Sequence, residues 1–333
     1  MINVGLIGLG AIGRLHFEAW QKSRVGRVSA ISSRDPRKLA GEWGGTEFNL
    51  GDQAAEKVDL TGIATYSGAE ELLADPDVQI VDLCTPTPLH APLAIAALRA
   101  GKHVFCEKPM ALDVAECIAM EEAARTSGRQ LMIGHCLRYW PHYVRAHEML
   151  ASGEFGRPIY ASLFRTGAPP LWSSGGWLLQ ADESGGVLDM HIHDIDVALW
   201  WFGRPRGVST TGYVQGELPM IMDAMWRYEG GFTAHLHSAW DPNGGAFRHG
   251  FKLVLEKATL AYDLAGDAAV LHVIRDVKVE SVPMETPAAH QAELDDFASC
   301  VAEGRPVTRF TPADSRAAVE FGLEELRQLR ASR

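Results

Sequence analysis

Lys108 is the residue whose type and position most clearly suggest chemistry. It lies in Glu107-Lys108-Pro109, directly after the apolar run His103-Val104-Phe105-Cys106, which is typical of a buried strand. A charge at the end of a buried strand is costly unless something uses it. In open α/β sheets, ligands bind at the carboxyl ends of the strands. Whether Lys108 is catalytic therefore depends on which other residues the chain places at the same edge of the sheet.

Asp189 and His193 form a second candidate group, on an expected helix over residues 187–202 that follows Gly185-Gly186. Because they are four residues apart, they share one helix face. A carboxylate that orients a histidine is a common general-base arrangement. The alternative is that Asp189 complements the helix dipole while His193 lies in the core. The sequence supports these two interpretations about equally.

A glycine motif lies near the start of the chain. Gly8-Leu9-Gly10-Ala11-Ile12-Gly13 is a GxGxxG between the apolar stretch Val4–Ile7 and a helical pattern, which is the context that this motif requires. Gly8 permits the tight turn, Gly10 lets backbone N–H groups approach a pyrophosphate, and Gly13 lets helix and strand pack closely. The helix N-terminus favours the phosphate charge. These features predict a dinucleotide site.

The residues after the second strand favour NADP, with NAD as the alternative. A ribose-binding acid is expected about 20 residues after the motif, and Ser33 followed by Arg34 occupies that place. Serine and arginine would bind a 2′-phosphate, which a carboxylate would repel. Two alternatives remain. Asp35 could reach the ribose, and Arg34 could be an ordinary surface residue.

Three further histidines raise the question of a metal. His191 lies two residues from His193 on the expected helix, so the two side chains point in different directions. His235 and His237 share one face of an expected strand, where an exposed or cleft-lining pair is the simpler interpretation. No cysteine lies at metal-ligand spacing. We expect no metal, and the sequence leaves the roles of these three histidines open.

The elements that must position these groups fall into two regions. Strand and helix signals alternate up to about residue 134, which predicts a parallel, doubly wound sheet. From about residue 160 to residue 274, strand-like stretches follow one another, and Glu229-Gly230-Gly231 marks a hairpin. We expect an α/β Rossmann domain over residues 1–135. An α+β domain with a large, mostly antiparallel open sheet is expected over residues 136–333, for substrate binding and oligomerisation.

Composition limits the classes of partner that the chain is expected to bind. The 333 residues carry a formal net charge of −11, which argues against nucleic acid or an anionic membrane as the main partner. No apolar run approaches the ~20 residues of a membrane span. The five cysteines include no CxxC pair, and a strand signal begins at Ile2, leaving no room for a signal peptide. We expect a cytoplasmic protein with reduced thiols.

The motifs together resemble a known family. The glycine motif, Cys84-Thr85-Pro86-Thr87-Pro88-Leu89-His90, the Lys108 tripeptide and the Asp189 helix are similar to those of the Gfo/Idh/MocA oxidoreductases, over about residues 1 to 203. The resemblance implies Lys108 beside the nicotinamide, a catalytic set completed by Asp189 and His193, and a peptide before Pro109 that is often cis. It also implies an open sheet that often forms an oligomer interface. The family usually has a small residue where this chain has His191.

The expected site residues follow from the motifs and the resemblance. The catalytic residues are Lys108, Asp189 and His193. The expected cofactor contacts are Gly8, Gly10, Ala11, Ile12, Gly13, Ser33, Arg34, Thr85, Pro86, His90, Glu107 and Lys108. The expected substrate contacts are Lys108, Arg138, Trp172, Trp177, Asp189 and His193. His90 could instead cap its turn, and both tryptophans could be packing or interface residues.

The function expected is an NADP(H)-dependent oxidoreductase. It would transfer hydride between the nicotinamide and a hydroxyl or carbonyl carbon of a sugar, polyol or sugar derivative, as the resemblance implies. Two alternatives are an NAD-dependent glycoside hydrolase of the same fold and a nucleotide-sensing regulator. The expected partners are a small sugar or polyol and further copies of the chain, as a dimer or tetramer through the C-terminal sheet, without nucleic acid or membrane.

Overall fold

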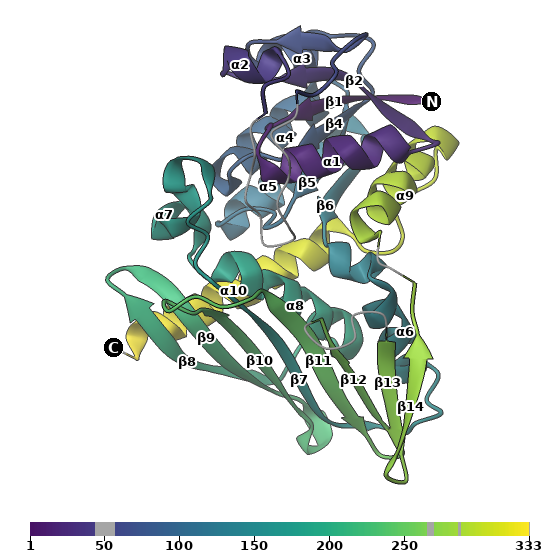
Figure 1. The fold of residues 1–333 in the computed structure, drawn as a ribbon, viewed down its shortest axis with the longest axis vertical. Coiled ribbons are helices and arrows are strands. Elements are labelled where there is room, and N and C mark those ends of the chain that lie inside the picture. Colours follow the sequence, from purple (N-terminus) through teal and green to yellow (C-terminus); the bar gives the residue numbers. More distant parts are fainter. Residues whose placement is uncertain (44–56, 265–269, 286–287, 333) are drawn as a thin grey trace. The chain divides into compact units, whose positions relative to one another are not determined.

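The computed structural model describes residues 1–43, 57–264, 270–285 and 288–332 (Figure 1). Contacts within the chain divide it into two compact units. Unit 1 comprises residues 1–136 and 290–319, and unit 2 comprises residues 137–289 and 320–333. This division differs from the expected domain ranges because residues 290–319 pack with the amino-terminal part. The roles expected of the two domains remain predictions.

Unit 1 is built on a six-stranded parallel sheet with the order β3-β2-β1-β4-β5-β6. This is the strand order of dinucleotide-binding Rossmann folds. Its elements are β1 (Ile2–Ile7), α1 (Ala11–Lys22), β2 (Gly26–Ser32), α2 (Pro36–Leu39), β3 (Ala64–Tyr66), α3 (Ala69–Ala74), β4 (Ile80–Leu83), η1 (Thr87–Leu89), α4 (His90–Arg99), β5 (His103–Glu107), α5 (Val114–Ser127), β6 (Leu131–Gly134), most of α9 (Ala289–Glu303) and the start of α10 (Pro312–Ala331).

Local sequence explains how these elements begin and end. The strands β4 and β6 are buried at every position, as expected where helices cover both faces of a parallel sheet. Helix α5 begins after Asp113, whose carboxylate accepts hydrogen bonds from the N–H groups of Ala115 and Glu116. The helix ends at Gly128, which has a φ of 66° that glycine adopts without strain.

Unit 2 contains an eight-stranded sheet with the order β14-β13-β12-β11-β7-β10-β9-β8. All neighbouring strands are antiparallel except β7 and β10, which are parallel. Its elements are η2 (Cys136–Tyr139, mostly in this unit), α6 (Pro141–Ala151), β7 (Pro158–Gly167), η3 (Ser174–Leu179), α7 (Ala181–Ser184), α8 (Leu188–Phe202), β8 (Gly207–Gln215), β9 (Leu218–Arg227), η4 (Glu229–Gly231), β10 (Thr233–Trp240), β11 (Arg248–Leu255), β12 (Thr259–Asp263), β13 (Val270–Arg275) and β14 (Lys278–Pro283).

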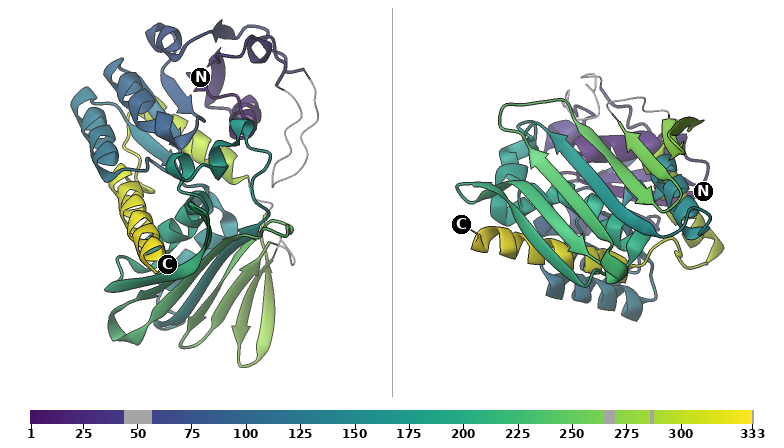
Figure 2. Two further views of the ribbon diagram at one scale, coloured as in Figure 1. Left: turned by 90° about the vertical axis from the view of Figure 1, so that its left-hand side faces the viewer. Right: turned by 90° about the horizontal axis from the view of Figure 1, so that it is seen from below.

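The two faces of the eight-stranded sheet differ. Along β7 and β10, buried residues alternate with half-buried ones, so one face belongs to the core. Helix α8 packs on that face, against β7, β9 and β10. The view from below shows the strands of this sheet in front of the helices of unit 2 (Figure 2). On the described part of the chain, the opposite face therefore has no covering helix from unit 2.

The predicted fold class is confirmed: a Rossmann sheet is joined to a large, mostly antiparallel sheet. Sequence reasoning did not find the short strand β3, the helix α6 or the strands β12 and β14. The expected strand over residues 269–274 begins at Ala269, which lies outside the described residues, and β13 begins at Val270.

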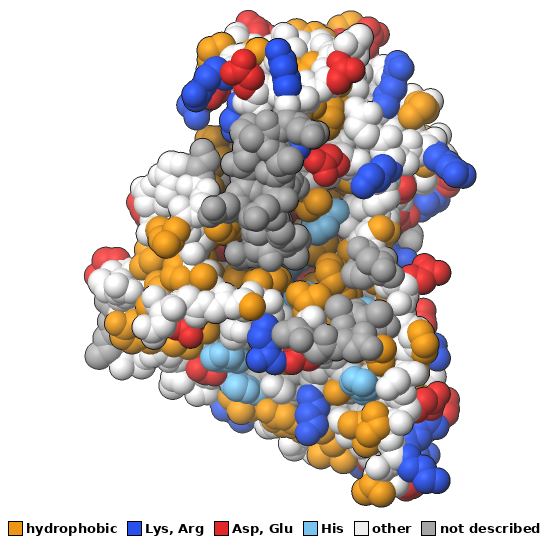
Figure 3. Space-filling view, viewed as in Figure 1, with side chains coloured by type: hydrophobic (Ala, Val, Ile, Leu, Met, Phe, Trp, Pro, Cys, Tyr) orange, Lys and Arg blue, Asp and Glu red, His pale blue; other side chains and the backbone are white. Residues whose placement is uncertain are grey.

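The surface carries charges of both signs. On the face drawn in Figure 3, Lys and Arg side chains are interspersed with Asp and Glu, so the net charge of −11 does not gather into one acidic patch there. None of the helices in the described part of the chain has the length and hydropathy that crossing a bilayer requires.

Candidate active site

Three of the sequence motifs lie at one edge of the parallel sheet. The strand order reverses between β1 and β4, and ligands of such sheets bind at the carboxyl ends of the strands beside this point. Gly8 follows β1, Thr85 follows β4, and Lys108 follows β5. Because β1, β4 and β5 are parallel neighbours, these residues meet at the same edge.

The glycine turn leaves room for a ligand at one position. Gly8 has a φ of +98°, and a Cβ there would lie 2.3 Å from the carbonyl oxygen of Cys84. A Cβ on Gly13 would lie 1.8 Å from the carbonyl oxygen of Gly8, whereas a Cβ on Gly10 would meet no atom within 4 Å. Gly8 and Gly13 are therefore required by packing, while Gly10 faces open space.

The amino terminus of α1 has the character of an anion site. Gly10 is its N-cap and offers no side-chain cap, and the first turn, which includes Ala11 and Ile12, carries no acidic residue. The N–H groups of this turn lack intrahelical acceptors, and the helix dipole favours negative charge beside them. This turn and the open space at Gly10 fit a dinucleotide pyrophosphate.

The end of β2 presents cations and a carboxylate that is already bound. Asp35 caps α2 by accepting the N–H of Arg37 at 3.0 Å, and its other oxygen pairs with the Arg37 guanidinium at 2.9 Å. These hydrogen bonds from Arg37 lower the pKa of Asp35. Ser33 Oγ accepts the N–H of Asp35 at 3.1 Å, and Arg34 is exposed. Because Asp35 already caps α2, the structure argues against the interpretation that Asp35 binds the ribose.

Lys38 is a candidate residue that sequence reasoning missed. Its Nζ donates a hydrogen bond to the carbonyl oxygen of Leu9, at 2.7 Å, so α2 is tied to the glycine turn. Burial lowers the pKa of Lys38, and Asp35 partly offsets this. The available signal was the run of basic residues that follows Ser33, although no sequence pattern shows which of them turns toward Leu9.

Lys108 is the most accessible member of its tripeptide. Glu107 and Pro109 are buried, Lys108 is half-buried, and the peptide bond between Lys108 and Pro109 is cis, as the resemblance implied. The backbone N–H of Lys108 donates to Glu107 Oε2 at 3.2 Å. Lys108 therefore stands at the carboxyl end of β5 on a backbone fixed by its neighbour.

Glu107 belongs to a buried polar cluster in unit 1. His16 Nε2 lies 3.2 Å from Glu107 Oε1, and His16 Nδ1 lies 3.0 Å from Asp82 Oδ2. Trp20 Nε1 donates to the same Asp82 oxygen at 2.8 Å. His16, Asp82 and Glu293 are 0% exposed. Neither carboxylate oxygen of Glu293 has a hydrogen-bond partner among the described residues.

The pKa shifts indicate how this cluster is charged. Burial is the largest single influence on His16 and would lower its pKa, but the interactions with Asp82 and Cys84 together outweigh it and raise this pKa well above its usual value. Burial is the largest single influence on Glu107 and would raise its pKa, but the interactions with His16, Lys108 and His290 together outweigh it and lower this pKa to about 2. Burial and then the Glu107 charge raise the pKa of Glu293 well above its usual value. These directions favour a protonated imidazole at His16, an ionised Glu107 and a protonated carboxyl group at Glu293.

His90 ties two of the motifs together. It is buried, with Nε2 at 2.9 Å from the carbonyl oxygen of Thr85 and Nδ1 at 2.8 Å from that of Pro109. Thr85 and Pro86 are half-buried on the loop between β4 and η1. Because both ring nitrogens face main-chain carbonyls, the structure favours the interpretation that His90 holds the loop, and a direct cofactor contact stays a prediction.

In unit 2, Asp189 and His193 share the accessible strip of a buried helix. Both are half-buried, whereas every other residue of α8 from Leu188 to Ala198 is buried. Gly185 and Gly186, with φ values of 72° and 65°, form the turn before the helix. The four-residue spacing therefore places both side chains on the one side of α8 that a ligand can reach.

Three buried polar contacts fix the orientation of α8. Arg138 Nη2 donates to Asp196 Oδ1 at 2.8 Å and Arg138 Nε donates to Asp196 Oδ2 at 2.9 Å. Arg165 Nη2 lies 3.4 Å from Asp194 Oδ1. The guanidinium of Arg138 thus holds a helix, which gives it a positioning task besides the substrate contact expected of it.

The third contact involves His191, the residue that departs from the family pattern. Its ring is fully buried, with Nδ1 at 2.8 Å from Ser238 Oγ and Nε2 at 2.8 Å from Glu325 Oε2. Trp226 Nε1 donates to the other oxygen of Glu325. His191 therefore faces the core behind α8 and does not reach the strip that holds Asp189.

The remaining candidates lie on the loop and the sheet. Trp172 and Trp177, around the start of η3, are half-buried. His235 Nε2 and His237 Nδ1 both contact Asp223 Oδ1, at 3.0 and 2.8 Å, which confirms that they share one face of β10. The described residues contain two groups with metal-like spacing, and each of them centres on His16 and includes none of these histidines.

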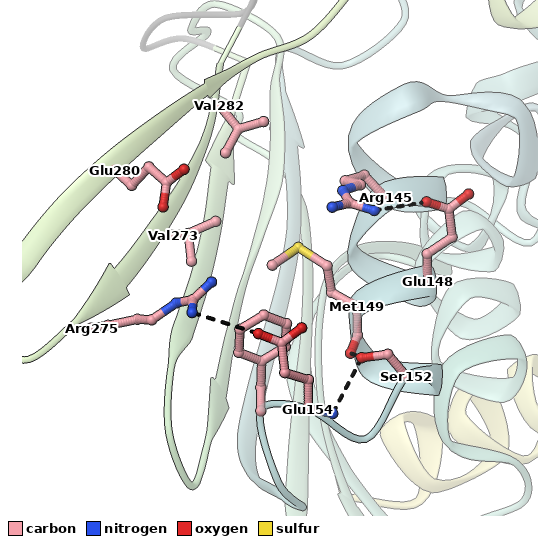
Figure 4. Close-up of a pocket in the computed structure, with 10 residues that line it drawn as sticks. Arg145, Glu148, Met149, Ser152, Glu154, Val273, Arg275, Glu280 and Val282 are labelled. Carbon is pink, nitrogen blue, oxygen red and sulfur yellow. Dashed lines mark hydrogen bonds and ion pairs between the residues drawn. The ribbon is translucent and has the colours of Figure 1, made fainter.

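One surface hollow of unit 2 does not coincide with the candidate site. It lies between α6 and the β13–β14 hairpin, and none of the expected site residues lines it. Arg145 pairs with Glu148, and Arg275 faces Glu154 across the hollow (Figure 4). These four charged side chains therefore have partners within the hollow.

The strand order and glycine turn of unit 1 define a dinucleotide-binding Rossmann domain. The sequence profile of the oxidoreductase family with an NAD-binding Rossmann fold (GFO/IDH/MocA) matches residues 2–135, and that of the GFO/IDH/MocA C-terminal domain matches residues 143–261. The chain belongs to this family of oxidoreductases.

Curated relatives are about one third identical to the chain over the residues that align. The 1,5-anhydro-D-fructose reductase of Ensifer adhaerens is 34% identical over 248 residues, covering 71% of this chain and 68% of that protein. The myo-inositol 2-dehydrogenase of Thermotoga maritima is 33% identical over 206 residues, covering 61% of this chain and 55% of that protein. Several other relatives are likewise matched over only 53–56% of their length.

Solved structures resemble the whole chain. A levoglucosan dehydrogenase in complex with NADH and levoglucosan has a TM-score of 0.85 and 22% sequence identity, covering 100% of this chain and 98% of that chain. A UDP-N-acetylglucosamine 3-dehydrogenase from Acidithiobacillus ferrooxidans has a TM-score of 0.78 and 24% identity, covering 99% and 98%. At these sequence identities, the structural similarity shows a shared fold alone.

Proposed function

We propose that the chain is an NADP(H)-dependent dehydrogenase or reductase that acts on a CH–OH or carbonyl carbon of a sugar, polyol or sugar derivative. The observation that carries this proposal is Lys108, a half-buried lysine at the carboxyl end of β5, at the same sheet edge as the glycine turn. Related proteins named as a 1,5-anhydro-D-fructose reductase and a myo-inositol 2-dehydrogenase support the substrate class.

In the proposed mechanism, the residues of this chain handle the oxygen and its proton. His193 accepts the proton of the substrate hydroxyl as a general base. Lys108 binds the same oxygen and stabilises the negative charge that develops on it. Asp189 orients these groups. A nicotinamide cofactor held at the glycine turn would supply the hydride acceptor or donor. Lys108 lies in unit 1 and the other two lie in unit 2, so the meeting of the three side chains is part of the proposal.

The preference for NADP rests on the end of β2. Asp35 is occupied by Arg37, so no other acid directly after Ser33 is available to accept a ribose hydroxyl. Ser33, Arg34 and Lys38 offer a hydroxyl and two cations in the same segment, which suits a 2′-phosphate. Ser33→Asp should shift the ratio of kcat/KM for NADP over NAD toward NAD. An unchanged ratio would count against a phosphate site here.

The test of the function is a substrate panel assayed with NADP and with NAD. The panel contains 1,5-anhydro-D-fructose, myo-inositol, levoglucosan and common hexoses, and the nicotinamide absorbance is followed. We expect net reduction or oxidation of the cofactor with at least one member. Lys108→Ala should abolish turnover while nucleotide binding stays within about threefold. Full activity of this variant would refute the role of Lys108.

The same panel separates the alternatives. A hydrolase that uses bound NAD would cleave glycosides without net change in nicotinamide absorbance, and a nucleotide sensor would bind the cofactor without turnover. Among the described residues, no specific contact favours either alternative. In addition, a nucleotide sensor would not need both Lys108 and His193.

We also propose that the chain forms a dimer or tetramer through the uncovered face of its eight-stranded sheet. Tyr213 on β8 is 50% exposed and Val279 on β14 is 61% exposed. Exposed apolar side chains on an uncovered sheet face are typical of an interface. Sedimentation velocity should give a dimer or tetramer, and Tyr213→Arg should shift it toward the monomer. A monomeric wild-type protein would contradict this proposal.

A further inference from the structure

The backbone that carries Lys108 is held on both sides by buried histidines. On one side, Glu107 Oε2 accepts the N–H of Lys108, and Glu107 Oε1 lies 3.2 Å from His16 Nε2. On the other side, the carbonyl oxygen of Pro109 lies 2.8 Å from His90 Nδ1. The tripeptide is therefore fixed at its neighbours, and the side chain of Lys108 is the part that remains half-exposed.

His16 is well placed to fix Glu107. It lies on α1, is fully buried, and directs Nδ1 at the Asp82 carboxylate. A carboxylate only accepts hydrogen bonds, so Nδ1 carries the proton. Trp20 holds the same carboxylate from the next turn of α1. The imidazole consequently has one orientation, with Nε2 facing Glu107.

We propose that His16 is a positioning residue for Lys108 that acts through Glu107. The proposal rests on the oxidoreductase function proposed above, because the task of Lys108 is defined there. His16 supplies the positive charge that keeps the Glu107 carboxylate turned into the cluster. Without that charge, Glu107 turns toward the ammonium group of Lys108, and the Lys108 N–H loses its acceptor.

The other charged and titratable groups around Glu107 come from three elements. Asp82 and Cys84 lie at the end of β4, Lys108 follows Glu107, and α9 contributes His290 and Glu293. Burial, followed by the charge on His16, lowers the pKa of His290 to about 4, so this ring is neutral at pH 7. A neutral Glu293 does not compete with Glu107 for His16, so the pair is preserved.

The kinetic test uses His16→Gln, Glu107→Gln and the double variant. Each single variant should lower kcat about 10- to 100-fold, the cost of a small misplacement, with nucleotide Kd within about threefold of wild type. If His16 acts through Glu107, the double variant should be no slower than the worse single variant. Multiplied losses, or weaker nucleotide binding without loss of kcat, would overturn the proposal.

His103→Gln is the matched control. His103 lies at the opposite end of β5, where its ring accepts the N–H of Gln130 and contacts Arg129. This substitution perturbs the same strand with the same change of side chain, far along it from Lys108. Its kcat should match wild type. A loss equal to that of His16→Gln would mean that any damage to the strand is sufficient, and would refute a specific role.

Hydrogen exchange tests the same idea without turnover. In His16→Gln and in Glu107→Gln, the backbone N–H of Lys108 should exchange at least about tenfold faster, since one lost hydrogen bond is worth about 1.4 kcal/mol. It should keep its wild-type rate in His103→Gln. If no substrate is found, the proposed function fails while this measurement still decides the positioning role. Unchanged exchange in His16→Gln would overturn it.

Two further measurements test how the cluster is charged. His16, Glu107 and Glu293 also have metal-like spacing, so one divalent ion per purified chain would overturn the proposal by making His16 a neutral ligand. Glu293→Gln keeps the shape of a neutral acid, and the Lys108 N–H should exchange at the wild-type rate in this variant. Exchange as fast as in His16→Gln would show that Glu293 is charged.

Discussion

Glu325→Leu should be among the most destabilising single substitutions in unit 2. Glu325 is fully buried and accepts from two donors, His191 Nε2 at 2.8 Å and Trp226 Nε1. Removing it leaves an indole N–H and an imidazole without their acceptor. Breaking a buried pair in this way costs about 3–5 kcal/mol, and an unsatisfied buried donor alone costs about 1–3 kcal/mol. We expect a loss of about 3 kcal/mol in the free energy of unfolding.

The assay is urea unfolding at pH 7, followed by tryptophan fluorescence and by circular dichroism. Glu324→Leu is the matched control, because Glu324 is the adjacent residue on α10 and its side chain, 39% exposed, pairs with Arg327 on the surface. The control should cost no more than about 1 kcal/mol. Equal losses in the two variants would refute the reasoning.

A double variant examines the same contact from the other side. Replacing both His191 and Glu325 by leucine removes the polar groups together, and such replacements are often much less costly than removing one partner. His191→Leu/Glu325→Leu should therefore recover part of the stability lost in Glu325→Leu. An additive loss would show that the two side chains contribute independently.

Three further predictions concern stability. Burial lowers the pKa of His142 to about 4, so between about pH 6.5 and pH 4 this side chain binds a proton only in the unfolded chain. As the pH falls through this range, the free energy of unfolding should therefore decrease by about 1.4 kcal/mol per pH unit less in His142→Phe than in the wild type. Val277 adopts a φ of 58° at an exposed turn, and Val277→Gly should raise the unfolding free energy by about 1 kcal/mol. Asp113→Ala, which removes the cap of α5, should lower it by about 1 kcal/mol.

The parts of the site that the sequence predicted are those with a local signal. Gly8 to Gly13 are contiguous, and their steric needs follow from one turn. Lys108 stands out because a charge directly follows an apolar strand. Asp189 and His193 are four residues apart, and helical geometry alone places them on one face.

Contacts between distant parts of the chain could not be predicted in the same way. His16 has the spacing of a core residue of α1, and nothing near it in the sequence indicates Asp82 or Glu107 as partners. The helical signal at Glu293 predicts α9 but not the direction of its carboxyl group. In the sequence, Lys38 is likewise one of several basic residues, and only the fold shows that it contacts Leu9.

The elements that sequence reasoning missed have similar causes. The strand β3 (Ala64–Tyr66) has only three residues and almost no burial, so it lacks an apolar pattern. In β14, most residues are exposed, and Lys278 and Glu280 are typical of an edge strand rather than of a core. These segments are strands because they pair with a neighbouring strand, and not because their own residues form a strand-like pattern.

The packing of α9 in unit 1 has a consequence for biosynthesis. Phe105 packs against Phe297, and Ser23 donates to Asp295, so the Rossmann sheet is completed by residues near the far end of the chain. At ~5–20 residues per second, translation delivers α9 on the order of tens of seconds after β5. During that interval, the nascent sheet exposes Phe105 and an ion pair that is normally sealed from water. We therefore expect a fragment ending at residue 136 to be prone to aggregate.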